Sequence, residues 1–254
     1  MLFRSSGQYY LSITNWDGAQ NRIGLFDSQN GNFFEFDGQN LYAVRRSSIF
    51  QIAGRVNVTG GSATVTGSTN FATSFNKQLA PGDWIVIRGQ SYRVDTIASD
   101  TSLTLTQAYR GPDASNVTVS KTQDLRIPRS NWNIDKCDGT GPSGYTLDLT
   151  KMQMFYIDYS WYGAGAIRFG LRAADGRIQY CHRVVNNNQN YLAWMRSGNL
   201  PARYETNTLT PVLTMNGSFS SAQTSFGVAN NLTYNMNNFP QQGRSEEHTS
   251  ELQS

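Results

Sequence analysis

Residues 154–184 read MFYIDYSWYGAGAIRFGLRAADGRIQYCHRV, and this stretch decides the fold class. In its first part Phe155, Ile157 and Tyr159 fall on one face of an extended chain. Successive side chains of a β-strand point to opposite faces, and one apolar face is typical of a sheet packed on a second sheet. The stretch therefore predicts neighbouring antiparallel strands of a β-sandwich.

Turn signals place further strands beside this stretch. Asp175-Gly176 lies between two strand-like runs, and Asp37-Gly38 lies between FFEF and LYAV near the start of the chain. An Asp-Gly pair flanked by alternating apolar residues is a strong hairpin signal. Because the first and third parts of the chain share this texture, we predict one jelly-roll-like β-sandwich from residues 1–46 plus 124–207.

The middle of the chain has a different texture. Residues 47–123 contain very short apolar runs separated by Gly-Gly, Pro-Gly and Ser-Asp turns, as in RVNVTGGSATVTG. Strands this short favour a small closed barrel, since closure removes the exposed edges of a small sheet. The expected fold is thus all-β, with a small β-barrel inserted in one loop of the sandwich.

Composition and charge exclude several classes of protein. The 254 residues are 38% apolar and 12% aromatic, which is too aromatic for a disordered chain. The formal charge is +3, and Arg45-Arg46 is the one local cluster of basic residues, so we expect no nucleic-acid partner. No apolar run is long enough to cross a bilayer, so no membrane partner is expected either.

The sequence shows no metal or nucleophile motif. His182 stands beside Cys181 with no second histidine at ligand spacing, which favours an ordinary strand histidine. Cys137 and Cys181 could form a disulfide, but two reduced thiols are the simpler expectation. Residues 137–144, CDGTGPSG, lack the Lys-Ser/Thr of a phosphate loop and predict a turn. We predict no catalytic, metal or cofactor site.

Two carboxylates interrupt apolar strands. Asp158 and Glu35 would suit a glycosidase if they faced one cleft about 5–10 Å apart. The favoured alternative is that each lies on the solvent face of its strand, or pairs across the sheet with Arg168 or Arg172.

Tryptophans offer a different kind of site. A row of exposed aromatic rings could stack on sugars, although aromatic residues of a β-sandwich more often pack in its core. The candidates for carbohydrate contact are Trp16, Trp132, Trp161 and Trp194.

Several motifs resemble one family. RIGLFDSQNGNFFEFDGQNLYAVRRSS at 22–48, YSWYGAGAIRFG at 159–170 and GNLPARYE at 198–205 resemble a virion structural protein, tail- or neck-associated, of T4-like tailed bacteriophages of marine bacteria. The likeness covers most of 1–46 and 124–207, and the middle segment is similar to a small β module of phage tail-associated proteins.

The resemblance implies a role in the particle rather than a reaction. It implies an assembly or scaffold module of the tail, the neck or a fibre, located in the virion and assembled in the bacterial host cytoplasm. The implied partners are other virion proteins and further copies of the chain in a homo-oligomer. The alternative is a carbohydrate-binding module that contacts a glycan of the host cell surface.

The end of the sequence carries a separate resemblance. Residues 208–243 look like the opening of a further β module, broken off before its strands are complete. Residues 244–254, RSEEHTSELQS, resemble the translation of a common sequencing-library adapter, which indicates a metagenomic fragment and an artefactual tail. We therefore expect the tail to be unpacked, and we exclude His248 from every site argument.

Overall fold

The computed structural model describes residues 4–13, 19–151, 153–160, 163–173, 175–196, 198–208 and 224–225. The tail at 244–254 lies outside these residues, as does nearly all of the predicted further module at 208–243. Trp16 and Trp161 also lie outside them.

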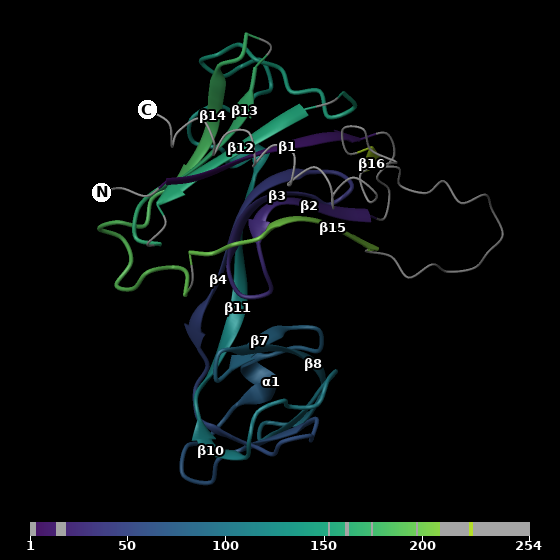
Figure 1. The fold of residues 1–254 in the computed structure, drawn as a ribbon, viewed down its shortest axis with the longest axis vertical. Helices are drawn as coiled ribbons and strands as arrows, with labels where there is room; N and C mark the ends of the chain where they lie inside the picture. Colours follow the sequence, from purple (N-terminus) through teal and green to yellow (C-terminus); the bar gives the residue numbers. More distant parts are fainter. Residues whose placement is uncertain are drawn as a thin grey trace, which may run out of the picture.

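The fold is all-β, which confirms the sequence-based prediction (Figure 1). In the described chain the one α-helix has four residues, and no helix there could span a membrane. The sandwich strands are β1 (Arg4–Ile13), β2 (Ala19–Phe26), β3 (Gly31–Phe36), β4 (Leu41–Gln51), β11 (Val119–Pro128), β12 (Gln153–Ser160), β13 (Ile167–Arg172), β14 (Ile178–Val184), β15 (Ala202–Thr208) and β16 (Thr224–Ser225). The remaining elements are β5 (Val56–Val58), β6 (Thr64–Gly67), α1 (Phe75–Gln78), β7 (Trp84–Ile87), β8 (Gln90–Ser99), β9 (Ser102–Leu105), β10 (Ala114–Val117) and a 3-10 turn (Arg129–Asn131).

Two antiparallel sheets face each other in the sandwich. The smaller sheet has the order β14-β13-β12-β1-β16, and the facing part of the larger sheet has the order β11-β4-β3-β2-β15. Phe34 of β3 packs between the sheets, with its ring centroid 4.6 Å from that of Phe155 and 5.4 Å from that of Phe169. Phe155, Ile157 and Tyr159 are buried in the same core, as their alternation predicts.

Both predicted hairpins are present. Asp37-Gly38 connects β3 to β4 and Asp175-Gly176 connects β13 to β14. Each glycine has a positive φ, 95° at Gly38 and 80° at Gly176. Glycine adopts this conformation without the steric cost that a Cβ atom would impose, which explains the position of each Asp-Gly pair.

The middle segment closes on itself. Its strands pair in the order β10-β5-β6-β9-β8-β7-β11, and a single residue, Thr118, separates β10 from β11. Strands β10 and β11 therefore form one nearly continuous stretch of chain. This stretch pairs with β5 at one end of the order and with β7 at the other, which closes the barrel. A second core fills it, and all its buried members lie between Ile52 and Val119.

The chain passes between the two cores along paired strands. Strands β4 and β11 are antiparallel neighbours from Tyr42–Pro128 to Gln51–Ser120, with one irregularity in register. Figure 1 shows both strands running from the sandwich into the barrel. The residues at which we divided the chain, 46–47 and 123–124, lie inside these strands. The connection is a hydrogen-bonded ladder rather than a loose linker.

Phe34→Ala tests the sandwich core. We expect it to lower the free energy of unfolding by about 3–5 kcal/mol, because it removes a fully buried ring and leaves a cavity. Phe50→Ala is the matched control, since Phe50 lies on β4 with 40% of its surface exposed. Chemical denaturation followed by circular dichroism measures both. Equal losses for the two variants would contradict the proposed core.

Candidate functional site

Three charged side chains lie in a row on the face of the larger sheet that points away from the sandwich core. Glu205 of β15 is directly opposite Arg22 of β2, and Arg22 is directly opposite Glu35 of β3. Side chains directly opposite each other on antiparallel strands share a face and are close enough to interact. The strand register therefore places a guanidinium between two carboxylates.

Glu35 is the centre of this row. Its exposed fraction is 0%, and each of its oxygens accepts a hydrogen bond from an arginine. Arg22 Nε donates to Oε2 at 2.7 Å, and Arg126 Nε donates to Oε1 at 2.6 Å. A carboxylate is stable without solvent only when it is paired and hydrogen-bonded. Glu35 thus joins β2, β3 and β11 across the intervening strand β4.

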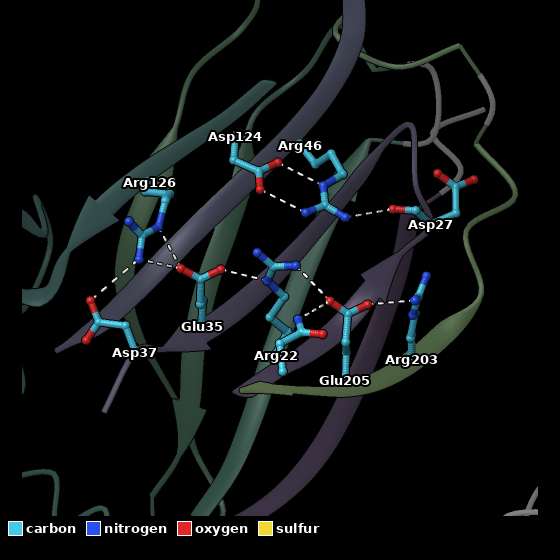
Figure 2. Close-up of polar contacts among 10 residues, drawn as sticks. Arg22, Asp27, Glu35, Asp37, Arg46, Asp124, Arg126, Arg203 and Glu205 are labelled. Carbon is cyan, nitrogen blue, oxygen red and sulfur yellow. Dashed lines mark hydrogen bonds and ion pairs between the residues drawn. The ribbon is translucent and has the colours of Figure 1, made fainter. Parts of the chain in front are cut away.

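The row continues in both directions (Figure 2). At one end Nη2 of Arg126 lies 3.6 Å from Oδ2 of Asp37. At the other end Glu205 pairs with Arg22 at 2.7 Å and with Arg203 at 2.6 Å. Acids and arginines alternate along this row, which we call the charge ladder: Asp37, Arg126, Glu35, Arg22, Glu205 and Arg203. Its positive and negative charges are equal in number.

Arg22 and Glu205 stay ionised at neutral pH. Burial alone would lower the pKa of the Arg22 guanidinium, but the charge and hydrogen bond of Glu35 outweigh burial and raise it. Burial alone would raise the pKa of Glu205, but the hydrogen bond from Asn207 and the charges of Arg22 and Arg203 lower it. Both shifts favour the charged form, as expected for opposite charges in contact.

A second ion pair lies beside the ladder. Arg46 donates from Nε and Nη2 to the two oxygens of Asp124, each at 2.8 Å (Figure 2). The Arg46 guanidinium lies 5.1 Å from the centre of the Phe33 ring, a cation–π distance. Position 24, next to Phe33 on the neighbouring strand, requires a glycine. A Cβ atom there would lie 2.6 Å from the Cβ of Phe33, which is too close for two carbon atoms that are not bonded.

A polar cleft of about 940 Å³ opens between this face and the barrel. The sandwich lines the cleft with three members of the ladder, Arg22, Arg203 and Glu205. The barrel lines it with residues 82–84 and Arg93. The strand that joins them contributes residues 121–124.

One contact links the two walls of the cleft directly, and two others fix each wall to the joining strand. The side chain of Gln29 in the sandwich donates to the carbonyl oxygen of Gly89 in the barrel at 2.9 Å. On the joining strand, Lys121 Nζ pairs with Asp83 of the barrel at 2.6 Å, and Thr122 Oγ1 donates to the carbonyl oxygen of Ser28 in the sandwich at 3.0 Å. The cleft is therefore bounded by cross-linked walls.

Asp158 has the structural role that the sequence favoured. It is directly opposite Arg168 across β12 and β13, and Arg168 donates a hydrogen bond to it. The pairing predicted for Glu35 was wrong, because its partners are Arg22 and Arg126 rather than Arg168 or Arg172. Glu35 and Asp158 lie on opposite outer faces of the sandwich, since their neighbours Phe34 and Ile157 meet in the core. These two carboxylates do not form a glycosidase pair.

The burial of two tryptophans corrects the list of sugar-contact candidates. Trp132 is 4% exposed and Trp194 is 1% exposed, and both belong to the sandwich core. Trp132 stands edge-on to Phe34, and Trp194 stands edge-on to Tyr159. Rings enclosed in this way offer no face to a sugar, because apolar packing between the sheets has covered them.

The cysteines and His182 are structural. Cys137 and Cys181 are free and buried. Burial and the nearby Asp135 raise the pKa of the Cys137 thiol to about 12, and burial raises the pKa of Cys181 as well. A protonated thiol is a poor nucleophile and a poor metal ligand. Burial lowers the pKa of His182, and its Nδ1 accepts a hydrogen bond from the backbone N–H of Asn133.

The glycine-containing segment 137–144 wraps around a carboxylate of the chain itself. The backbone N–H groups of Cys137 and Ser143 donate to Asp135 at 2.7 and 2.9 Å. A Cβ atom on Gly141 would lie 2.1 Å from an Asp135 oxygen, so glycine allows this approach. These backbone N–H groups are therefore committed to Asp135, and the predicted turn is present, with Gly144 N donating to the carbonyl oxygen of Gly141 at 3.0 Å. In the described chain no cluster of His, Cys, Asp or Glu could hold a metal ion.

Sequence reasoning missed the partners of Glu35. Arg22 in RIGLF, Glu35 in FFEF, and Arg203 and Glu205 in ARYE all stand at positions that alternate with core residues. Opposite charges at such positions on neighbouring strands are a pairing signal. For Arg22 and Glu205, which are 183 residues apart, the signal could have been used only with the strand order known.

The exposure of Trp84 was also missed. The alternation places Trp84 on the face opposite Ile85 and Ile87, which fill the barrel core. Trp84 follows the Pro81-Gly82 turn and is 38% exposed, at the wall of the cleft.

Comparisons with known proteins show no family. No protein-family model matches the chain, and no curated protein sequence is significantly similar to it. Among solved structures, a phage phi92 endosialidase aligns with 72% of this chain and 31% of its own, at 9% sequence identity and a TM-score of 0.21. A likeness at this level carries no conclusion about function.

Glu35→Gln tests the buried ion pairs. We expect the free energy of unfolding to fall by about 3–5 kcal/mol, because the substitution leaves Arg22 and Arg126 without the charge that balances them. Asp175→Asn removes an ion pair with Arg177 in which both side chains are mostly exposed, and should change stability little. Denaturation of the two variants side by side provides the measurement. If Glu35→Gln were as mild as the control, the buried ladder would be refuted.

Glu205 gives the ladder a dependence on pH. Its pKa is lower in the folded state than its ordinary value of 4.5, so its stabilising effect is complete above that value and is lost as the pH falls through the lower, folded-state pKa. The stability difference between the natural chain and Glu205→Gln should therefore be largest near neutral pH and shrink in acid. Unfolding measured at neutral pH and at several values below 4.5 tests this. A constant difference would contradict it.

Proposed function

We propose that the chain is a structural component of a bacteriophage particle, a module of the tail, the neck or a fibre that acts by assembly and without catalysis. The motifs at 22–48, 159–170 and 198–205 support the family. The single structural observation that carries the role is the coupling of two β modules through the paired strands β4 and β11.

A rigid coupling suits a part that transmits load or holds spacing. Two strands hydrogen-bonded along their length resist bending more than a single-chain linker does. The contacts Lys121–Asp83 and Thr122–Ser28 brace the same junction. The carboxylates of the ladder are committed to the chain's own arginines, which supports a structural role for that face.

The proposal includes the setting in which the module works. Most assemblies of identical chains are closed and symmetric, so we propose a homo-oligomer in contact with other virion proteins. Its location is then the virion, after assembly in the cytoplasm of the bacterial host. The alternative of a host-glycan module loses Trp132 and Trp194 as contacts, and any such role must rest on other residues.

Mass spectrometry of purified particles tests the proposal. We expect peptides from residues 22–48 and 159–205 in particles banded on a density gradient, in several copies per particle by quantification against labelled standards. A replication enzyme of the same phage is the control for contamination and should be absent. Absence of these peptides from intact particles, with other virion proteins present, would overturn the proposal.

A further inference from the structure

We propose that the cleft between the barrel and the charge ladder binds an acidic oligosaccharide, with Trp84 and Arg93 as its recognition residues. The inference goes beyond the structural role and does not depend on it. A binding cleft and a scaffold are compatible in one chain, and the two are tested by separate experiments.

The charges of the cleft favour an anion. Five cationic side chains and three carboxylates line it, and Glu35, which lies outside the lining, balances Arg22, so one positive charge is in excess. Glu205 is paired within the ladder, Asp124 is paired with Arg46, and Asp83 is paired with Lys121. Arg93 has no carboxylate partner among the described residues. Its Nε donates to the carbonyl oxygen of Gly82 at 3.3 Å, a weak contact that leaves the guanidinium free to bind an anion.

An aromatic face stands beside this cation. Trp84 and Arg93 are directly opposite each other on β7 and β8. The indole is 38% exposed although it is a large apolar side chain. The Arg93 guanidinium reaches along Gly82, where a Cβ atom would lie 3.4 Å from Nη2, at van der Waals contact. A planar apolar surface next to a free cation suits the ring of a sugar acid, with the ring on the indole and the acid group on the arginine.

The rest of the lining favours a sugar over a peptide. The amide groups of Gln20, Gln123 and Asn207 provide donors and acceptors for sugar hydroxyls, and the hydroxyl oxygen of Thr122 provides an acceptor. Trp84 is the one large apolar side chain in the lining, whereas a bound peptide needs several apolar contacts. The volume of about 940 Å³ is at the upper end of the usual range for ligand sites, so an extended ligand fits better than a single small ion.

Titration calorimetry with defined probes tests the site on the whole chain. The probes are an oligogalacturonate for carboxylated sugars, a heparin-derived oligosaccharide for sulfated sugars, neutral dextran as a control, and poly-glutamate as an acidic peptide. We expect one of the two acidic oligosaccharides to bind, more weakly as salt is raised, and neutral dextran to bind poorly. The stronger of the two acidic probes identifies the acid group.

Substitutions locate the binding. Trp84→Ala and Arg93→Gln should each weaken binding about tenfold or more. Both side chains lie at the surface, so the fold should survive. The matched controls are Phe71→Ala and Arg55→Gln, which remove an exposed ring and the guanidinium 4.4 Å above it elsewhere on the barrel. These controls should leave binding unchanged.

Three outcomes would overturn the proposal. In the first, neither acidic oligosaccharide binds more tightly than dextran. In the second, Trp84→Ala and Arg93→Gln bind as well as the two controls do. In the third, poly-glutamate binds as tightly as the sugars and loses affinity in the same variants, which assigns the cleft to an acidic peptide. Circular dichroism of each variant shows that a loss of binding is not a loss of fold.

Discussion

The burial of one carboxylate between two guanidinium groups constrains the whole of the larger sheet. Glu35 is fully enclosed, and among the described residues Arg22 and Arg126 neutralise it. Its neighbour Phe34 fills the sandwich core from the other face of the same strand. A shift of one residue in register would exchange the two, placing a carboxylate among aromatic rings and a phenyl group between two arginines. The ion pairs and the core therefore specify the same register.

This constraint also shapes the cleft. The arginines that balance Glu35 and Glu205 are held on the sheet face, so the sandwich wall of the cleft is nearly neutral. The free positive charge lies on the barrel instead, at Arg93. Because Trp84 is directly opposite it, the same two strands supply both a cation and an aromatic face. The site we propose arises where the two modules meet, and neither module contains it alone.

The junction itself is a consequence of strand continuity. Strands β4 and β11 are long enough to belong to the sandwich at one end and to reach the barrel at the other. The barrel closes because β10 and β11 are consecutive, so β11, the partner of β4 in the sandwich, also completes the barrel. A two-stranded ladder keeps the modules at a defined distance, as a particle component and a cleft between modules both require.

The sequence by itself determined the all-β class, the two Asp-Gly hairpins and the closed barrel. These depend on residue alternation and on turns, which are local properties of the chain. Tertiary structure alone decided that Trp132 and Trp194 are enclosed, that Glu35 binds Arg22 and Arg126, and that Trp84 faces a cleft. Alternation shows that two faces exist but not which neighbour covers each face. That neighbour is supplied by strands far away in sequence, as in the pair of Arg22 and Glu205, 183 residues apart.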